Sequence, residues 1–176
     1  MPEHLFHFSE DPSIGQFVPH VAATSDVETP LVWAIDAEHA DLYYFPRDCP
    51  RVTFRELPGT SPADRDRCLG FSTARRVAAI EAAWLDRLRD TRLYRYVLPG
   101  SAFELRDAKA GYWVSRQVVE ATRVEPVGDL LAALADADVE IRIVPSLWPL
   151  YEAVLASTLG FSIIRWRNAA LARRDR

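Results

Sequence analysis

The stretch Leu5-Phe6-His7-Phe8-Ser9 opens the chain as a short, aromatic-rich run. It stops at Glu10-Asp11-Pro12, where proline fixes φ and removes a backbone donor. We therefore predict a strand over residues 4–8, followed by a short helical turn. Successive side chains of a strand point to opposite faces, so His7 is expected opposite Phe6 and Phe8. If the two phenylalanines face the core, His7 lines the other side as a cleft residue.

The rest of the chain extends this strand into a mixed pattern of strands and helices. Apolar alternation and short apolar runs predict strands at 31–35, 51–55, 93–98, 103–105, 112–124 and 139–144. Helical spacing predicts helices at 37–45 (capped by Asp36), 73–89, 126–135 and from 146 onward, with a loop over 57–72; residues 77–80 are ambiguous between helix and strand. Strands outnumber helices without strict alternation, which favours an α+β fold with a mixed, mainly antiparallel sheet and flanking helices.

Length and composition are those of one globular domain. The chain has 176 residues, of which 49% are hydrophobic and 11% aromatic, enough apolar surface to offset the entropy of ordering it. No repeat or linker divides it, so we predict a single domain over 1–176 with a frayed basic tail over 165–176.

Charge and cysteine usage restrict the class of protein further. The formal net charge of −4 gives no strong nucleic-acid signal, because phosphate neutralisation needs a basic face. No apolar run is long enough to cross a bilayer, and no apolar leader opens the chain. We therefore expect a cytoplasmic protein without a membrane partner, with free thiols at Cys49 and Cys68.

The common catalytic signatures are absent from the sequence: GxxxxGK[ST], GxGxxG, HExxH, CxxC and GxSxG. No metal is expected, because no pair among His4, His7, His20, His39 and Glu38 has the spacing of a zinc-binding helix. Cys49 is a candidate thiolate nucleophile, since Arg47 and Arg51 flank it and would lower its pKa. No histidine and acid can be assigned to it as partners.

Four segments carry a resemblance that covers nearly the whole chain. They are LFHFSEDP at 5–12, PLVWAIDAEHA at 30–40 with FPRDCPRV following at 45–52, GYWVS at 111–115 and PSLWPL at 145–150. Together they resemble an uncharacterised bacterial family of unknown function. The resemblance implies a self-contained family and brings no assigned activity.

A more distant resemblance rests on three motifs. A first strand that carries His7, the segment Ala40-Asp41-Leu42-Tyr43 after a later strand, and the late strand at 115–120 ahead of the proline-marked turn at 124–127 resemble the ADP-ribosyltransferase fold with its His, Tyr and Glu motifs. Tyr44 is a near alternative to Tyr43. Gln117 occupies the best-aligned position of the glutamate.

This second resemblance implies an NAD site. It implies that His7 hydrogen-bonds the nicotinamide ribose and that Tyr43 or Tyr44 stacks on the nicotinamide ring, with Ser9 as a further cofactor-binding residue. The glutamate of that fold holds the ribose hydroxyl beside a developing oxocarbenium ion, a role that benefits from negative charge. On this basis the catalytic residues are His7, Tyr43 and Gln117, and the cofactor is NAD.

Because Gln117 stands where the fold has a glutamate, the resemblance implies a lower transferase activity for this chain. Gln117 offers hydrogen bonds without charge, and Glu120 is three residues on, which on a strand is the opposite face. We therefore expect a protein that binds NAD or a related nucleotide with weak or absent transferase activity. Any enzyme activity would be NAD-dependent and ADP-ribosyl- or phosphotransferase-like.

The alternative is a non-catalytic domain that binds a small molecule or another protein through exposed aromatic residues such as Trp148 and Trp166. The two hypotheses differ in geometry. The nucleotide hypothesis requires His7, Tyr43 or Tyr44, and Gln117 to converge on one cleft.

Overall fold

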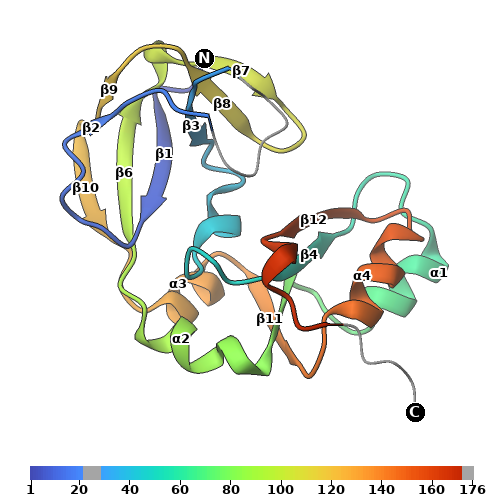
Figure 1. Cartoon of the computed structure of the whole chain (residues 1–176). Coiled ribbons are helices and arrows are strands. Elements are labelled where there is room, and N and C mark those ends of the chain that lie inside the picture. Colours follow the sequence, from blue (N-terminus) through green and yellow to red (C-terminus); the bar gives the residue numbers. More distant parts are fainter. Residues whose placement is uncertain (22–28, 172–176) are drawn as a thin grey trace. The chain divides into compact units, whose positions relative to one another are not determined.

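The computed structural model describes residues 1–21 and 29–171. Contacts group the chain into two compact units (Figure 1). Unit 1 comprises Met1–Tyr44 and Arg92–Gly128, and unit 2 comprises Phe45–Thr91 and Asp129–Arg176. Neither unit is a continuous segment, because the chain passes from one unit to the other at three points. A single domain over the whole chain stays a prediction.

Unit 1 is built on a six-stranded sheet in which every pair of neighbours is antiparallel. Figure 1 shows the order β10-β6-β1-β3-β8-β7 from left to right. The strands are β1 His4–Ser9, β3 Val32–Ile35, β6 Tyr94–Pro99, β7 Glu104–Asp107, β8 Tyr112–Ser115 and β10 Arg123–Pro126; β2 Gln16–Phe17 pairs with β9 Val119–Glu120, and η1 Ala40–Tyr43 and η4 Gly100–Ala102 are 3₁₀ turns. The predicted mixed, mainly antiparallel architecture is confirmed here.

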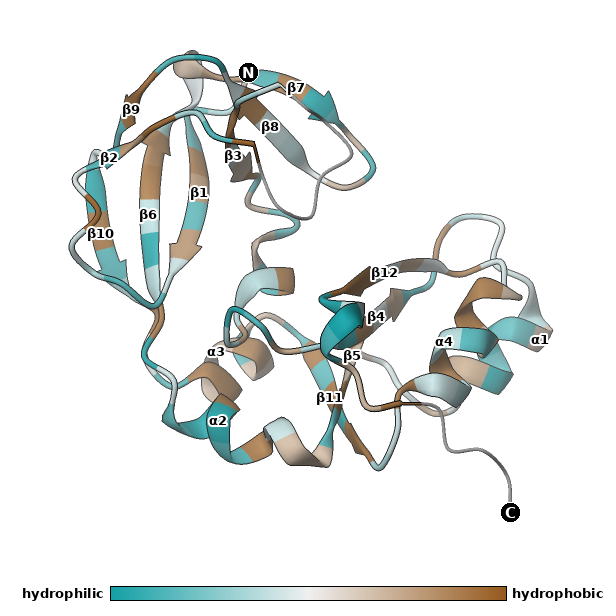
Figure 2. Ribbon diagram, in the orientation of Figure 1, coloured by the Kyte–Doolittle hydropathy of each residue, from teal (hydrophilic) through white to brown (hydrophobic). Residues whose placement is uncertain are grey.

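The two edge strands of this sheet are hydrophilic (Figure 2). β10 reads Arg-Val-Glu-Pro and β7 reads Glu-Leu-Arg-Asp. Charged side chains and proline at an edge discourage pairing with another chain, because they solvate the strand or remove a backbone donor. Each edge of the sheet thus carries its own protection against association.

One face of the unit 1 sheet, here called the core face, carries a hydrophobic cluster. Its buried residues are Leu5, Phe17, Val32, Ala34, Tyr96, Leu98, Phe103 and Val119. The segment between β1 and β2 folds back over this face: the Tyr96 hydroxyl donates to Asp11 O at 2.6 Å and accepts from Ile14 N at 3.1 Å. These long-range bonds bring Phe17 onto the sheet.

The predicted helical turn after Ser9 does not form. Ser9 Oγ accepts a hydrogen bond from Asp11 N, and the Asp11 carboxylate accepts from the backbone and hydroxyl of Ser13. Short polar side chains that bond the backbone two residues away favour a turn over a helix. The chain therefore reverses toward β2 without a helix.

Unit 2 is built on a four-stranded sheet of order β11-β5-β4-β12, in which β11 and β5 are parallel and the other pairs antiparallel. Its strands are β4 Arg51–Arg55, β5 Arg76–Glu81, β11 Val139–Val144 and β12 Gly160–Ile164. Its helical elements are α1 Pro62–Asp64, the π-helical turn η2 Arg65–Leu69, η3 Ala82–Trp84, α2 Leu85–Asp90, α3 Leu130–Asp136, α4 Trp148–Leu155 and η5 Trp166–Asn168.

Two predictions for unit 2 are wrong. The helix predicted over 73–89 is instead strand β5, followed by η3 and the short helix α2. All six residues of β5 are buried, because the strand lies between β4 and β11, and a central strand is apolar on both faces. The loop predicted over 57–72 contains α1 and η2, where Ser61 caps α1 by accepting from Asp64 N.

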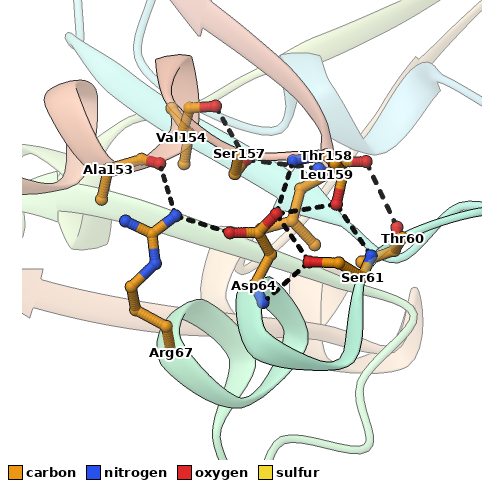
Figure 3. A network of polar contacts seen from close by, with 9 residues as sticks. All are labelled: Thr60, Ser61, Asp64, Arg67, Ala153, Val154, Ser157, Thr158 and Leu159. Carbon is orange, nitrogen blue, oxygen red and sulfur yellow. Dashed lines mark hydrogen bonds and ion pairs between the residues drawn. The ribbon is translucent and has the colours of Figure 1, made fainter.

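Asp64 ties α1 to the connection between α4 and β12 (Figure 3). Its Oδ2 accepts from Thr158 N at 2.9 Å, from Thr158 Oγ1 at 2.8 Å and from Ser61 Oγ at 2.9 Å, while its Oδ1 accepts from Arg67 Nη2 at 2.7 Å. These bonds, the Thr158 backbone bond first, hold the pKa of the Asp64 carboxyl far below its ordinary value. The ionised carboxylate is therefore the form that holds this junction together.

The first part of the predicted tail, residues 165–170, is hydrogen-bonded to the rest of unit 2. Arg165 Nε donates to Arg47 O at 2.9 Å, Asn168 Nδ2 donates to Asp48 O at 2.7 Å, and Ala170 N donates to the buried Glu81 carboxylate. Residues 172–176 of the predicted tail lie outside the described residues. Among the described residues, no helix is long and apolar enough to span a bilayer.

Candidate functional site

His7 lies on the core face of the unit 1 sheet. It sits directly opposite Tyr96 of β6, its ring centroid lies 4.8 Å from that of Phe17, and its Nδ1 lies 3.1 Å from Trp33 O. The expectation that His7 is opposite Phe6 and Phe8 agrees with the alternation of β1. His7 lies on the same face as the cluster around Leu5, so it does not line the side away from that cluster. Phe6 and Phe8 lie half-buried on the other face. Val97 and Ile35, the residues paired with Phe6 there, are buried.

Ser9 shares the core face with His7, two residues along β1. It is buried, and its hydroxyl is engaged by Asp11 N at 3.1 Å. Its role in the structure is to close the turn after β1. The prediction that it contacts a cofactor stays a prediction.

Tyr43 and Tyr44 lie on the opposite face of β1, around Phe8. The Phe8 and Tyr43 rings are nearly parallel, at an interplanar angle of 6° and a centroid distance of 6.2 Å. The Tyr44 ring meets Phe8 edge-on at 5.5 Å. Tyr43 also donates its hydroxyl hydrogen to the Tyr112 hydroxyl at 3.1 Å.

Gln117 is exposed, in the connection between β8 and β9. Its backbone N donates to Ser115 Oγ at 3.2 Å. The structure brings Tyr43 and Tyr44 together, but it places His7 on the other face of the sheet from both. The predicted convergence of histidine, tyrosine and glutamine on one cleft is therefore not formed within unit 1.

Sequence reasoning missed the surface on which the two tyrosines lie, here called the aromatic face. It consists of the rings of Phe6, Phe8, Trp33, Tyr43, Tyr44 and Tyr112, all half-buried. Phe6 is paired with Ile35 and Ile35 with Tyr112, so β1, β3 and β8 each direct one residue of this row to the same side. The Trp33 and Tyr112 rings meet edge-on at 5.8 Å. The alternation of β1 is the sequence signal that puts Phe6 and Phe8 on one side of the strand. It does not show which side of the sheet the segment after β1 covers.

The β10 end of the aromatic face is charged. Phe8 is paired with Arg95 of β6, and Arg95 with Glu125 of β10, so the three side chains form one cross-strand row. The Arg95 guanidinium lies over the Phe6 ring, 5.3 Å from its centroid. An aromatic surface and a cationic group thus lie side by side on one sheet face.

The position of η1, and with it Tyr43, is fixed by a tight corner. Asp36 Oδ1 accepts from His39 N at 3.0 Å and lies 2.8 Å from His39 Nδ1. Gly111 has a φ of +71° and packs against this pair, since a Cβ there would lie 2.3 Å from His39 Nδ1. The predicted capping by Asp36 is thus realised on His39, and a 3₁₀ turn replaces the expected helix.

The predicted activation of Cys49 is wrong. Burial raises the pKa of the Cys49 thiol to about 12, against the opposing charges of Arg51 and Arg87. Desolvation of the thiolate outweighs the two guanidinium groups. Cys49 and Cys68 are both free and buried, as the prediction of free thiols requires.

A metal centre finds no support in the part of the chain that the structure describes. Within residues 1–21 and 29–171, no group of three or more His, Cys, Asp or Glu residues is placed to hold an ion. The aromatic face with its charged end is the candidate site.

The comparisons place the chain in a family. Residues 6–169 match the model of a family of unknown function, DUF6886. The chain belongs to this family. The predicted uncharacterised family is thereby confirmed, and the matched range of DUF6886 includes most of β1 and every later element through η5, and hence parts of both units. No curated protein and no solved structure matches the chain. The ADP-ribosyltransferase resemblance stays a prediction.

The tryptophans of the alternative hypothesis pack together in unit 2 of this DUF6886 chain. The Trp148 and Trp166 centroids are 4.8 Å apart, and Trp166 stacks on Tyr151 at 4.2 Å. Trp148 Nε1 donates to Ala170 O at 2.8 Å. This cluster holds the C-terminal segment against α4, which accounts for both tryptophans without a partner.

Proposed function

We propose that the aromatic face of unit 1, a site other than the predicted cleft of His7, Tyr43 and Gln117, binds the flat ring of a nucleotide-like ligand, with NAD or a related nucleotide as the class to test first. The single observation that carries this proposal is the set of half-buried rings gathered around Phe8 on the face opposite the hydrophobic cluster. Stacking of a base on such rings contributes about 1–3 kcal/mol per base.

The arrangement of Tyr43 and Tyr44 supports a ring site. Tyr43 is nearly parallel to Phe8 and Tyr44 is edge-on to it, so a ligand ring beside Phe8 meets one tyrosine face and one tyrosine edge. The hydrogen bond from Tyr43 to Tyr112 fixes the first of these rings. A fixed ring loses little conformational entropy when a ligand stacks on it.

Binding without group transfer is the function these residues favour. Gln117 carries no charge, and His7 is on the other face of β1 from the tyrosines, so neither supplies negative charge to a developing positive charge beside the aromatic face. We therefore propose that the protein binds the nucleotide with weak or absent transferase activity.

Calorimetric titration with NAD and ADP-ribose tests the proposal. Tyr44→Leu, which keeps an apolar side chain but removes the ring, is expected to weaken binding about 10-fold, as the loss of one stacking contact does. The matched control is His7→Ala, on the opposite face of the same strand, which should bind like the wild type. Circular dichroism and melting temperature establish that both variants fold.

Two outcomes count against the proposal. One is no binding by the folded wild-type protein up to millimolar ligand. The other is loss of binding in His7→Ala with Tyr44→Leu unaffected, which would move the site to the core face.

A further inference from the structure

The charged end of the aromatic face holds two arginines on one carboxylate. Arg95 donates to Glu125 Oε2 from Nε at 3.0 Å and from Nη2 at 2.6 Å, and Arg123 Nε pairs with Glu125 Oε1. These contacts, the Arg95 bonds first, hold the pKa of Glu125 below its ordinary value, so it is ionised near neutral pH. Two guanidinium groups and one carboxylate leave one net positive charge.

Donors remain available on these arginines. The Arg123 side chain is 61% exposed, and across the described ranges its two terminal nitrogens make no hydrogen bond. Arg95 likewise keeps its Nη1 unbonded there. Because Glu125 fixes both Nε atoms, the remaining nitrogens are held in place for an anion. Planar guanidinium groups are well suited to phosphate oxygens.

The register sets the distance from this group to the rings. Glu125, Arg95 and Phe8 are neighbours in one row across β10, β6 and β1. Adjacent strands are about 4.8 Å apart, so Arg95 lies about 5 Å and β10 about 10 Å from β1 along the row. If the base of a nucleotide lies beside Phe8, its phosphate, which is separated from the base by the sugar, is therefore within reach of the arginines.

We propose that Arg95 and Arg123 bind a phosphate group of the ligand, so that the aromatic face selects nucleotides over nucleosides. This inference rests on the proposed function, since it needs the ligand's ring on the aromatic face. An ion pair exposed to water adds little stability by itself, so stability alone does not explain why two arginines share Glu125. The phosphate supplies the second anion that balances them.

Adenosine and AMP are matched probes, because they differ by one phosphate. For the wild-type protein, calorimetry should show AMP binding about 10-fold more tightly than adenosine, the value of a charge-assisted hydrogen bond. Arg123→Gln should reduce this ratio to about 3-fold or less and leave adenosine binding unchanged. Raising the salt concentration should reduce the wild-type ratio too, because the arginines are partly exposed.

The control is Arg106→Gln, on β7 at the opposite edge of the same sheet, where the arginine is also exposed. It should keep the wild-type ratio. Equal affinity of the wild type for adenosine and AMP would overturn the inference, as would equal weakening of both probes by Arg123→Gln.

The pattern of failure separates the two proposals. If adenosine binds in a Tyr44-dependent way and AMP binds no better, the phosphate site is wrong and the ring site stands. If neither probe binds at millimolar concentration, and NAD and ADP-ribose do not bind either, both are wrong. Selective binding of AMP that Arg123→Gln abolishes supports both.

Discussion

The two faces of the unit 1 sheet are made by the same strands and end in different states. On the core face, Leu5, Tyr96 and Leu98 are fully buried, because the segment after β1 folds over them and brings Phe17 onto the sheet. On the aromatic face, the rings around Phe8 remain half-buried, although Val97 and Ile35 on the same face are buried. Alternation along β1 sends neighbouring residues to both faces, and the segment folded over the core face completes the burial of the residues on that side.

This difference between the faces gives His7 a structural role. His7 lies between Trp33 O and the Phe17 ring, a setting typical of a packed histidine. The tyrosines predicted to share a site with it are on the other face. The half-buried rings of the aromatic face still expose apolar surface. A ligand can therefore stack on them without displacing a packed segment of the chain.

The largest expected effect comes from breaking the corner that holds the aromatic face. Gly111→Ala should destabilise the protein by about 3 kcal/mol or more, because the new Cβ meets His39 Nδ1 and the φ of +71° strains any side chain. Urea unfolding measures the loss. Gly128→Ala is the matched control: its φ is +85° with open space around it, so it should cost only about 1 kcal/mol. Equal losses in the two variants would show that the corner is not tightly packed.

The next effect compares the two faces directly. Leu5→Ala on the core face should cost about 2–5 kcal/mol, as truncation of a fully buried leucine does. Phe8→Ala should cost less despite removing a larger ring, because that ring is half-buried and leaves a smaller cavity. Free energies of unfolding from urea titration give both values. A loss for Phe8→Ala that equals or exceeds the Leu5→Ala loss would mean that the aromatic face is core as well.

The third effect is a loss of stability in acid that depends on Asp64. This carboxyl, whose pKa is lowered, belongs to unit 2, whereas the aromatic face belongs to unit 1. The pKa of Asp64 is lower in the folded chain than in the unfolded one. Its stabilising effect is therefore complete above the unfolded value of about 3.9 and is lost as pH falls through and below it. Melting temperature against pH should fall less steeply toward acid in Asp64→Asn, which starts from a lower value at neutral pH.

Asp66→Asn is the control for this titration, since Asp66 is exposed and its ion pair with Arg65 is long, at 3.8 Å. Its profile should follow that of the wild type. A profile for Asp64→Asn that is parallel to the wild type down to the lowest pH would contradict the role given to the junction.

The smallest expected effect is at Gln117. Gln117→Glu restores the carboxylate that the ADP-ribosyltransferase resemblance requires, yet residue 117 is exposed, and His7 lies on the other face of β1 from Tyr43. NAD hydrolysis, followed by release of nicotinamide, should stay at the background rate, and binding should be unchanged. A clear rise in hydrolysis would revive the histidine, tyrosine and glutamine site.

Local patterns in the sequence predicted much of the fold. β1, β3, β4 and β11 follow from apolar alternation or short apolar runs, which depend only on neighbouring residues. β5 was missed because its apolar run fits a helix equally well, and only pairing with β4 and β11 decides between them. β12 was missed because Gly160–Ile164 takes its place through pairing with β4, a contact distant in sequence.

The candidate site was predicted in part, for the same physical reason. Tyr43 and Tyr44 are on the aromatic face, but His7, which was predicted to share a site with them, is on the core face. Alternation shows that a strand has two sides and not which side is covered. That choice depends on the bond between Tyr96 and Asp11, which are 85 residues apart.

The most direct test of the central claim is a crystal structure of the protein with ADP-ribose bound. The adenine ring is expected in contact with Phe8 and Tyr44, on the aromatic face. An adenine ring beside His7 and Phe17, on the core face, would contradict it.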